Sequence, residues 1–187
     1  MKAIDLENAV ILDTETTGLS TQDEICEISV IDALTGQPLL DSLIKPTVTM
    51  YSTVIAIHGI TNEMVSSAPA YSEIHEQLMT IFKEKKVIIY NKGFDIKLIR
   101  QSAEKHDLTL VAKARSSFCA MKWYAEYYGQ WNSYRGSYKW QKLTDAAKQQ
   151  QIDISDVTAH RAVSDCEITR RLITAVNKKI IDESLNS

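Results

Sequence analysis

The stretch AVILDTETTGL, residues 9–19, joins an apolar run to two acids and a glycine. A run of Val, Ile and Leu is typical of a strand buried inside a sheet, and residues two apart on a strand point to the same face. Asp13 and Glu15 therefore project together, whereas Thr14 points the other way. Because two carboxylates on one face repel each other unless a cation neutralises them, the stretch predicts a central strand that ends in an acidic site. Gly18 then permits the turn that ends the strand and leaves room for a molecule to approach the backbone.

The composition indicates a single globular domain over residues 1–187. A hydrophobic content of 44% is sufficient for one sizeable core. Cys26, Cys119 and Cys166 form no CxxC pair and are odd in number, which argues against a disulfide scaffold or zinc ribbon and for a reducing compartment. No apolar stretch approaches a membrane span, and the N-terminus MKAIDLENAV carries acids where a signal peptide needs its apolar segment. We expect a cytoplasmic protein with no membrane partner.

Hydrophobic spacing then outlines strands and helices along the chain. We expect strands at 8–15, 24–33, 38–46 and 87–90. We expect short helical turns within 53–66 and helices at 70–82, 94–106, 119–128, 141–150 and 161–180. The last helix is marked by apolar residues that step by three or four positions from Ala162 to Ile180. This order of elements predicts an α/β domain with a mixed sheet.

The segment NKGFD, residues 91–95, follows the short buried strand. Asn91 is placed to cap or order the turn, Phe94 to anchor it, and Asp95 to lie in the opening of a helix. An ordinary helix N-terminus explains Asn and Asp equally well. However, the ends of strands that lead into helices are where open α/β sheets build their sites.

The segment AHRAVSD, residues 159–165, adds a histidine and a further acid. His160 and Asp165 are five residues apart, which on a continuous helix separates them by about 140°. That spacing is poor for two ligands of one metal, unlike the pair in HExxH. It suits a metal ligand at Asp165 and a proton acceptor at His160, although a lone histidine at a helix start is often a plain surface residue.

In order along the chain, the three segments supply D-x-E, D and H-x4-D, and this pattern resembles that of the DEDDh, or DnaQ-like, exonucleases. The blocks ILDTETTGL, IHGIT, NKGFD and AHRAVSDCEIT follow one another in the family's order. The resemblance runs from about residue 8 to residue 180 and implies an RNase H-like fold, a mixed five-stranded sheet flanked by helices.

The resemblance also implies roles for individual residues. The implied metal ligands are Asp13, Glu15, Asp95 and Asp165, and the implied general base is His160. The implied substrate contacts are Thr14, Thr16, Gly18, Leu19, His58, Asn91 and Phe94. For His58, a position at the end of a short helical turn is an equally good explanation. Tyr90 stands where the family often has a histidine.

The chemistry of phosphodiester hydrolysis agrees with this set of residues. Two divalent ions about 4 Å apart neutralise the phosphoryl oxygens and stabilise the leaving 3′-oxygen. Carboxylates are the hard ligands that Mg²⁺ or Mn²⁺ takes, and a histidine has the pKa to accept a proton near neutral pH. We therefore expect a 3′→5′ exonuclease that uses two such ions on a nucleic acid with a free 3′ end and releases nucleoside 5′-monophosphates.

Alternatives remain at this point. DNA is favoured because TETTG looks more like the proofreading type, but an RNA-directed enzyme resembling oligoribonuclease or RNase T stays open. A catalytically silent nucleic-acid-binding module is disfavoured because all five chemical positions are filled. The chain ends soon after its last expected helix, which favours a repair, processing or defence nuclease over a dedicated proofreader. A homodimer is left open.

A basic and aromatic segment completes the sequence features. From Lys113 to Lys142 the charge is +5, whereas the remainder of the chain carries −8. Residues 123–140 hold all three tryptophans and five of the eight tyrosines. The first part fits a helix that faces the core. The second part, residues 129–140, has no clean period and is expected to be a loop in which aromatic and basic side chains grip the nucleic acid upstream of the terminal nucleotide.

Overall fold

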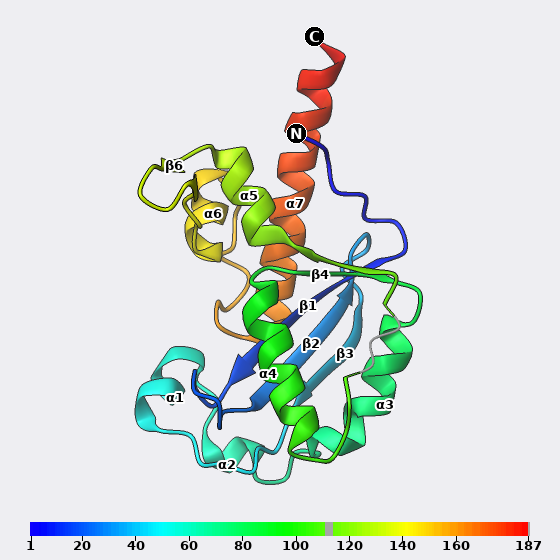
Figure 1. The fold of residues 1–187 in the computed structure, drawn as a ribbon, viewed down its shortest axis with the longest axis vertical. Helices are drawn as coiled ribbons and strands as arrows, with labels where there is room; N and C mark the ends of the chain where they lie inside the picture. The colour runs from blue at the N-terminus through cyan, green and yellow to red at the C-terminus, as the bar shows by residue number, and fades with distance from the viewer. Residues whose placement is uncertain (111–113, 187) are drawn as a thin grey trace.

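The computed structural model describes residues 1–110 and 114–186 and contains a mixed sheet between two layers of helices (Figure 1). The sheet consists of β1 (Ala9–Thr16), β2 (Ile25–Asp32), β3 (Pro38–Leu43), β4 (Lys86–Ile89) and β5 (Ser116–Cys119). Its order is β3-β2-β1-β4-β5, with antiparallel pairs on the β2 side of β1 and parallel pairs on the β4 side. The predicted α/β class and five-stranded mixed sheet are confirmed. β5 had no sequence signal of its own because its first two residues are exposed serines.

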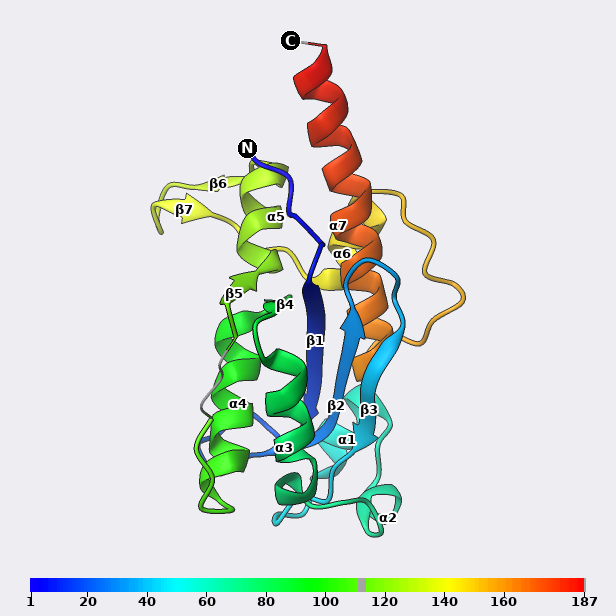
Figure 2. The ribbon, with the colours of Figure 1, turned by 90° about the vertical axis from the view of Figure 1, so that its right-hand side faces the viewer.

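Seven helices surround the sheet in the described part of the chain, all within a few residues of the expected positions. They are α1 (Ser52–His58), α2 (Asn62–Val65), α3 (Tyr71–Phe82), α4 (Lys92–Glu104), α5 (Ala120–Tyr128), α6 (Leu143–Gln149) and α7 (Ala162–Leu185). Figure 2 shows α3 and α4 on one face of the sheet and α7 on the other. Among the described residues, no helix has the length and apolar character needed to cross a bilayer.

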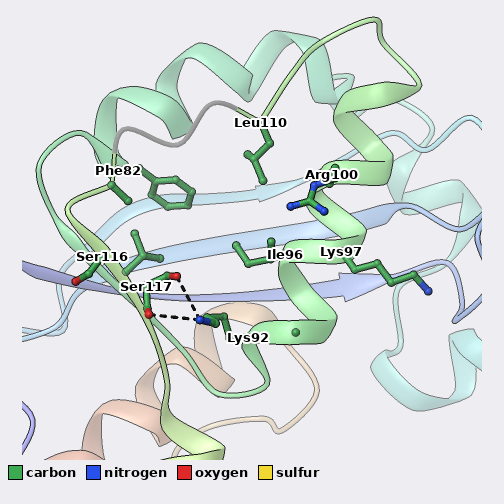
Figure 3. A pocket seen from close by; sticks show the side chains of 11 residues that line it. Phe82, Lys92, Ile96, Lys97, Arg100, Leu110, Ser116 and Ser117 are labelled. Carbon is green, nitrogen blue, oxygen red and sulfur yellow. Dashed lines mark hydrogen bonds between the residues drawn. The ribbon is translucent and has the colours of Figure 1, made fainter.

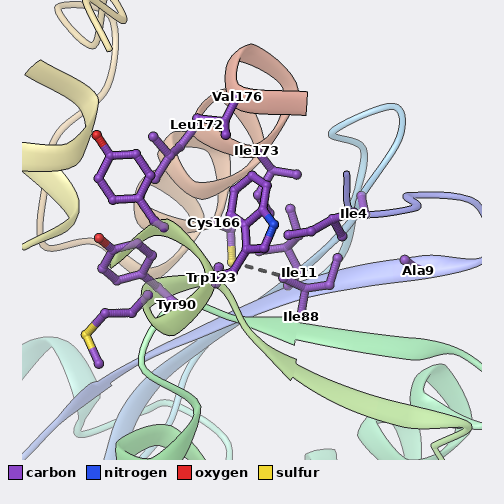
Figure 4. Close-up of a cluster of buried hydrophobic side chains, with 14 of the residues drawn as sticks. Ile4, Ala9, Ile11, Ile88, Tyr90, Trp123, Cys166, Leu172, Ile173 and Val176 are labelled. Carbon is purple, nitrogen blue, oxygen red and sulfur yellow. Dashed lines mark hydrogen bonds between the residues drawn. The ribbon is translucent and has the colours of Figure 1, made fainter. Parts of the chain in front are cut away.

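Alternation along β1 divides the core into two parts. Ala9 and Ile11 pack with α7 and α5 in one cluster (Figure 4), whereas Val10 and Leu12 pack with α3 and α4 in another. Because side chains alternate across a strand, the acids at positions 13 and 15 continue the face covered by α7. Position 14 continues the face covered by α4. The strand thus points functional side chains toward helices on both sides of the sheet.

The segment 129–140 is not the loop that we expected. It forms a small antiparallel hairpin of β6 (Trp131–Asn132) and β7 (Ser137–Tyr138), separate from the main sheet. Asn132 accepts from the backbone N–H of Arg135 through both its backbone and side-chain oxygens, and Gly136 takes a positive φ of 60°. These local contacts close the turn without any hydrophobic period, which is why periodicity did not indicate it. Lys113, the first residue of the basic segment, lies outside the described residues.

The three cysteines are free thiols, as the sequence led us to expect. Cys26 and Cys166 are buried, and Cys166 belongs to α7, with its sulfur near the backbone oxygens of Ile11 and Ser29. These contacts pack α7 closely on β1 and β2 and so set the distance between α7 and the acidic end of β1.

We predict that Ile173→Ala lowers the free energy of unfolding by about 2–5 kcal/mol, because Ile173 is a fully buried residue of α7 and truncating its side chain leaves a cavity. Ile181→Ala is the matched control on the same helix, since Ile181 is 48% exposed. The control is expected to change the free energy by no more than about 0.5 kcal/mol. Urea denaturation followed by circular dichroism measures both. Equal effects would mean that α7 does not pack as described.

Candidate active site

Three of the four predicted metal ligands lie together at the end of β1. Asp13 and Glu15 come from the strand, and Asp165 comes from the first turn of α7. Each offers a carboxylate oxygen, and these oxygens all lie within 4.8 Å of one another. The three side chains are half-buried, so they are partly shielded from water but remain accessible to a small ion.

Asp95 reaches the same strand from the opposite layer. It lies in the first turn of α4, is only 3% exposed, and accepts a hydrogen bond of 2.8 Å from the hydroxyl of Thr14. Thr14 faces α4 because of strand alternation, and its hydroxyl therefore ties Asp95 to β1. Asp95 is not a member of the close group of three, but its charge acts on Asp13 and Glu15.

Burial and mutual repulsion raise the pKa of all four acids. Loss of hydration is the first cause, and it raises the pKa of Glu15 to about 8 and the pKa of Asp95 to about 7. Burial likewise raises the pKa of Asp13 well above its ordinary value and raises the pKa of Asp165. The four acids therefore resist ionisation in the metal-free protein, and a bound cation would remove that resistance. Half-buried carboxylate oxygens of this kind fit a hard divalent cation such as Mg²⁺ or Mn²⁺.

His160 lies at the exposed entrance of the site, just before α7 begins. Its backbone takes a left-handed conformation with φ of 63°, which is uncommon for a residue other than glycine. Its backbone N–H lies 3.3 Å from Asp165 Oδ1 and donates to it. Its ring is not among the clustered acids and makes no hydrogen bond with the described residues. Asp165 thus lies with the clustered acids and the His160 ring outside them, and the ligand role of Asp165 and the acceptor role of His160 stay predictions.

The structure adds Glu27 and Arg161, which the sequence analysis missed. Glu27 lies on β2 directly opposite Glu15 and is 2% exposed. Arg161 donates to its carboxylate from Nε at 3.0 Å and from Nη2 at 2.5 Å, and the backbone N–H of Ala162 donates at 2.8 Å. Glu27 therefore caps the N-terminus of α7 and holds the segment between His160 and Asp165. The available signal was an acid at an inward position of the otherwise apolar strand ICEISV.

A β-bulge, a hydrogen bond from Thr16 and a close approach at Gly18 shape the end of β1 and the turn that follows it. The pairing of β1 with β2 shifts after Glu15, so that Cys26 has no partner on β1. A bulge of this kind redirects side chains at the end of a strand. Thr16 donates its hydroxyl to the backbone oxygen of Gly18 at 3.0 Å. A Cβ on Gly18 would lie 2.7 Å from the Asp23 carboxylate, so the glycine is needed for this close approach, and no positive φ is involved.

His58 supports this loop from behind. It is 6% exposed; its Nδ1 accepts from the backbone N–H of Ile60 at 3.0 Å, so Nε2 carries the proton and points 3.3 Å from the Thr16 backbone oxygen. Burial lowers the pKa of His58, which favours this neutral form. Leu19, in contrast, is 76% exposed. Contacts of Thr14, Thr16, Gly18, Leu19 and His58 with a substrate stay predictions.

Asn91 orders the turn before α4 through its backbone. Asn91 stands at the cap position of α4, but its side chain makes no capping hydrogen bond; its backbone oxygen accepts from the N–H groups of Phe94 and Asp95. Phe94 packs partly against the α3 and α4 core. Asn91 remains exposed, and its predicted contact with a substrate, like that of Phe94, is untested.

A separate hollow of about 500 Å³ lies along another face of α4 (Figure 3). Lys92, Lys97 and Arg100 line it together with Ser116 and Ser117 from β5, and no acid is among its lining residues. Lys92 points across the hollow to Ser117 (Figure 3). Its lining therefore presents positive charge, unlike the acidic group at the end of β1.

Comparison with known proteins decides the family. Residues 10–173 match the model of the RNase_T exonuclease family. An uncharacterized exonuclease, CP81, of Escherichia phage 186 is 41% identical over 177 residues, which cover 92% of this chain and 89% of that protein. The chain belongs to the DEDDh, or DnaQ-like, family of 3′–5′ exonucleases. It is therefore an exonuclease domain, a hydrolase of phosphodiester bonds in nucleic acid.

Other relatives of this exonuclease are similar over shorter regions. The epsilon subunit of DNA polymerase III from Buchnera aphidicola subsp. Schizaphis graminum is 32% identical over 123 residues, 60% of this chain and 52% of that protein. The chain thus spans about half the length of the epsilon subunit.

Solved structures share the RNase H-like fold. Exonuclease X in complex with 5′-overhanging duplex DNA has a TM-score of 0.67 at 24% identity, covering 91% of this chain and 92% of that one. The nuclease domain of 3′hExo, a DEDDh family member bound to rAMP, has a TM-score of 0.71 at 16% identity, covering 91% and 92%.

We predict that the metal-free exonuclease loses stability as the pH rises from about 4.5 to about 8, the ordinary and folded-state pKa values of Glu15. Its acids keep protons in the folded state that they lose in the unfolded state, so unfolding releases protons and the free energy of unfolding falls with rising pH. Saturating Mg²⁺ removes the repulsion and should flatten this dependence. Thermal melts across this pH range in EDTA and in Mg²⁺ measure the two pH dependences. The contributions of the other titrating groups are common to both series and cancel when one is subtracted from the other. Identical curves would contradict a cation site.

We predict that Glu27→Gln lowers exonuclease turnover more than it changes KM, because the amide still accepts from Ala162 but no longer holds Arg161 by charge. The free energy of unfolding should fall by about 1–3 kcal/mol, the range for a buried hydrogen-bonding group that loses its partner. Glu167→Gln is the matched control, since Glu167 also pairs with arginines on α7, namely Arg170 and Arg171. Unchanged turnover in the Glu27 variant would mean that α7 is positioned without this pair.

Proposed function

We propose that this chain is a metal-dependent 3′→5′ exonuclease that removes nucleoside 5′-monophosphates from the 3′ end of DNA with two Mg²⁺ or Mn²⁺ ions. The observation that supports it most is the group formed by Asp13, Glu15 and Asp165, whose carboxylate oxygens lie within 4.8 Å of one another. Asp95 adds a fourth negative charge from α4. A site with this much uncompensated charge favours cations together with a phosphate that balances them.

Each residue of the site has a defined task in this proposal. The four acids hold the ions, Thr14 fixes the carboxylate of Asp95, and Glu27 with Arg161 fixes the start of α7. When bound, divalent ions neutralise the phosphoryl oxygens and stabilise the leaving oxygen. His160, at the exposed entrance, accepts the proton of the attacking water. The water oxygen bonds to phosphorus as the bond from phosphorus to the 3′-oxygen breaks, and the product carries a 5′-phosphate.

The choice of DNA rests on the relatives. The epsilon subunits that match belong to DNA polymerase III in Buchnera and Rickettsia. The RNA alternative is supported by one of the solved structures, a 3′-exonuclease that recognises the 3′ end of a histone mRNA stem-loop, at 16% identity. Identity is higher to the DNA-associated proteins, and DNA is therefore the proposed substrate.

Digestion of end-labelled single- and double-stranded DNA and RNA tests the function. A 5′ label should give a ladder that shortens with time, whereas a 3′ label should appear at once in a mononucleotide. Both should require Mg²⁺ or Mn²⁺ and stop in EDTA. A mononucleotide released first from the 5′ label would overturn the polarity, and faster digestion of RNA would overturn the substrate. No hydrolysis of any substrate would support the silent binding module instead.

We predict that Asp13→Asn nearly abolishes hydrolysis and weakens binding of divalent metal, while the fold survives because the change is nearly isosteric and relieves repulsion. His160→Ala should lower the rate by about 10²–10⁴-fold but keep metal affinity, because the four acids remain. Calorimetry with Mn²⁺ and single-turnover digestion separate the two variants. A loss of metal affinity in His160→Ala equal to that of Asp13→Asn would make the histidine a ligand.

A further inference from the structure

The β6–β7 hairpin exposes large aromatic side chains that do not serve the core. Trp131 is 58% exposed, Tyr134 is 96% exposed and Trp140 is 55% exposed. None of the three contributes to a hydrophobic cluster of the described residues. Trp131 meets Tyr138 edge-on with ring centroids 5.2 Å apart, which holds the hairpin together but leaves most of the indole in water. Tyr134 and Trp140 take part in no ring–ring contact among the described residues, so the folding of the hairpin does not explain their exposure.

The charge of the hairpin restricts what can lie against it. Residues 129–142 contain Arg135, Lys139 and Lys142 and no acid. Arg135 and Lys139 form no ion pair within the described part of the chain, and both line a hollow of about 360 Å³ together with Tyr138 and Trp140. Cations without acid partners beside exposed rings are complementary to phosphates joined to flat bases.

The base of the hairpin is tied to the active site through Gln141. Its backbone oxygen accepts from the hydroxyl of Tyr90 at 2.9 Å, and Tyr90 immediately precedes Asn91, the cap residue of the helix that carries Asp95. The side chain of Gln141 donates to the backbone oxygen of Lys139 and accepts from Gln149. The base is therefore fixed by buried or half-buried hydrogen bonds, while the tip remains free to contact another molecule.

The hairpin and α1 lie toward different ends of β1. Figure 2 shows the hairpin beside α5, toward the beginning of β1, whereas α1 lies near the end of β1. α1 carries His58, which lies against Thr16 at that end of the strand. A nucleic acid that contacts both the acids and the hairpin therefore has to extend beyond its terminal nucleotide.

We propose that the β6–β7 hairpin holds the single-stranded segment on the 5′ side of the nucleotide being removed. Its rings stack on bases, and Arg135 and Lys139 meet the phosphates. The segment is single-stranded because bases in a duplex are already stacked on each other and offer no free face to a tyrosine or tryptophan. This inference rests on the proposed exonuclease function and adds to it a contact away from the metal ligands.

Two hairpin variants separate charge from stacking. Arg135→Ala/Lys139→Ala should weaken binding of a fluorescent single-stranded oligonucleotide in EDTA. The slope of the logarithm of the binding constant against the logarithm of salt concentration should become shallower by about 1.4, or about 0.7 for each lost phosphate contact. Tyr134→Ala should weaken binding by about fivefold or more with the salt dependence unchanged, because it removes a stacking ring and no charge. Fluorescence anisotropy measures both. All three side chains are exposed, so circular dichroism should match the parent protein.

The matched control is Lys97→Ala/Arg100→Ala, which removes one lysine and one arginine from the exposed face of α4. The control should leave oligonucleotide affinity near the parent value. Equal weakening by the control and the hairpin variant would mean that net charge, and not the hairpin, governs binding. Unchanged affinity in both hairpin variants would also overturn the inference, and a change in molecular mass by light scattering would make the hairpin a contact between copies of the chain.

A small substrate distinguishes this inference from the function on which it rests. Thymidine 5′-monophosphate p-nitrophenyl ester reaches only the acids, so its hydrolysis should be the same in the parent and both hairpin variants. A loss on this ester equal to the loss on the oligonucleotide would mean that the hairpin only supports the structure of the site. If the parent protein hydrolyses neither substrate, the proposed function fails, whereas the binding comparison still tests the hairpin.

Discussion

Repulsion among carboxylates brought out of water is the constraint on which the rest of this structure depends. Asp13, Glu15 and Asp165 lie within 4.8 Å of one another, and burial raises the pKa of each. Such an arrangement is unfavourable in the free protein and persists only when surrounding contacts hold it. The fold therefore holds these three acids together despite their repulsion, which a bound divalent cation would relieve.

The contacts that hold the acids come from both layers of helices. On one face, Cys166 and Ile173 pack α7 against the sheet, and Glu27 fixes its N-terminus through Arg161 and Ala162. On the other face, Thr14 ties Asp95 to β1. Alternation of side chains along one strand makes this possible, since neighbouring positions on β1 address opposite layers. The sheet thus brings together acids that no single helix or loop places side by side.

Within the part of the chain that the structure describes, the β6–β7 hairpin is hydrogen-bonded to the rest of the protein at its base but not at its tip. Its base is joined to the active-site edge through Tyr90 and Gln141, whereas its aromatic tip lies in water. A fixed base and an unengaged tip are suited to a contact that acts on substrates longer than one nucleotide. Tyr90 supplies the hydroxyl that makes this link.

By itself the sequence was sufficient for the α/β class and the approximate positions of the helices, and it singled out the four acids and His160 as candidates. Strand and helix periods are local, and the spacing of DTE and of H-x4-D can be read without knowing any long-range contact. β5, the hairpin turn and the Glu27–Arg161 pair were not predicted, because their signals lie between residues far apart in the chain or in turn geometry. Glu27 and Arg161 are separated by 134 positions, and only the folded sheet makes them neighbours. Local sequence patterns therefore identify the candidate residues. The distances between their side chains, and the electrostatic repulsion that depends on those distances, are set only when β1, α4 and α7 pack together.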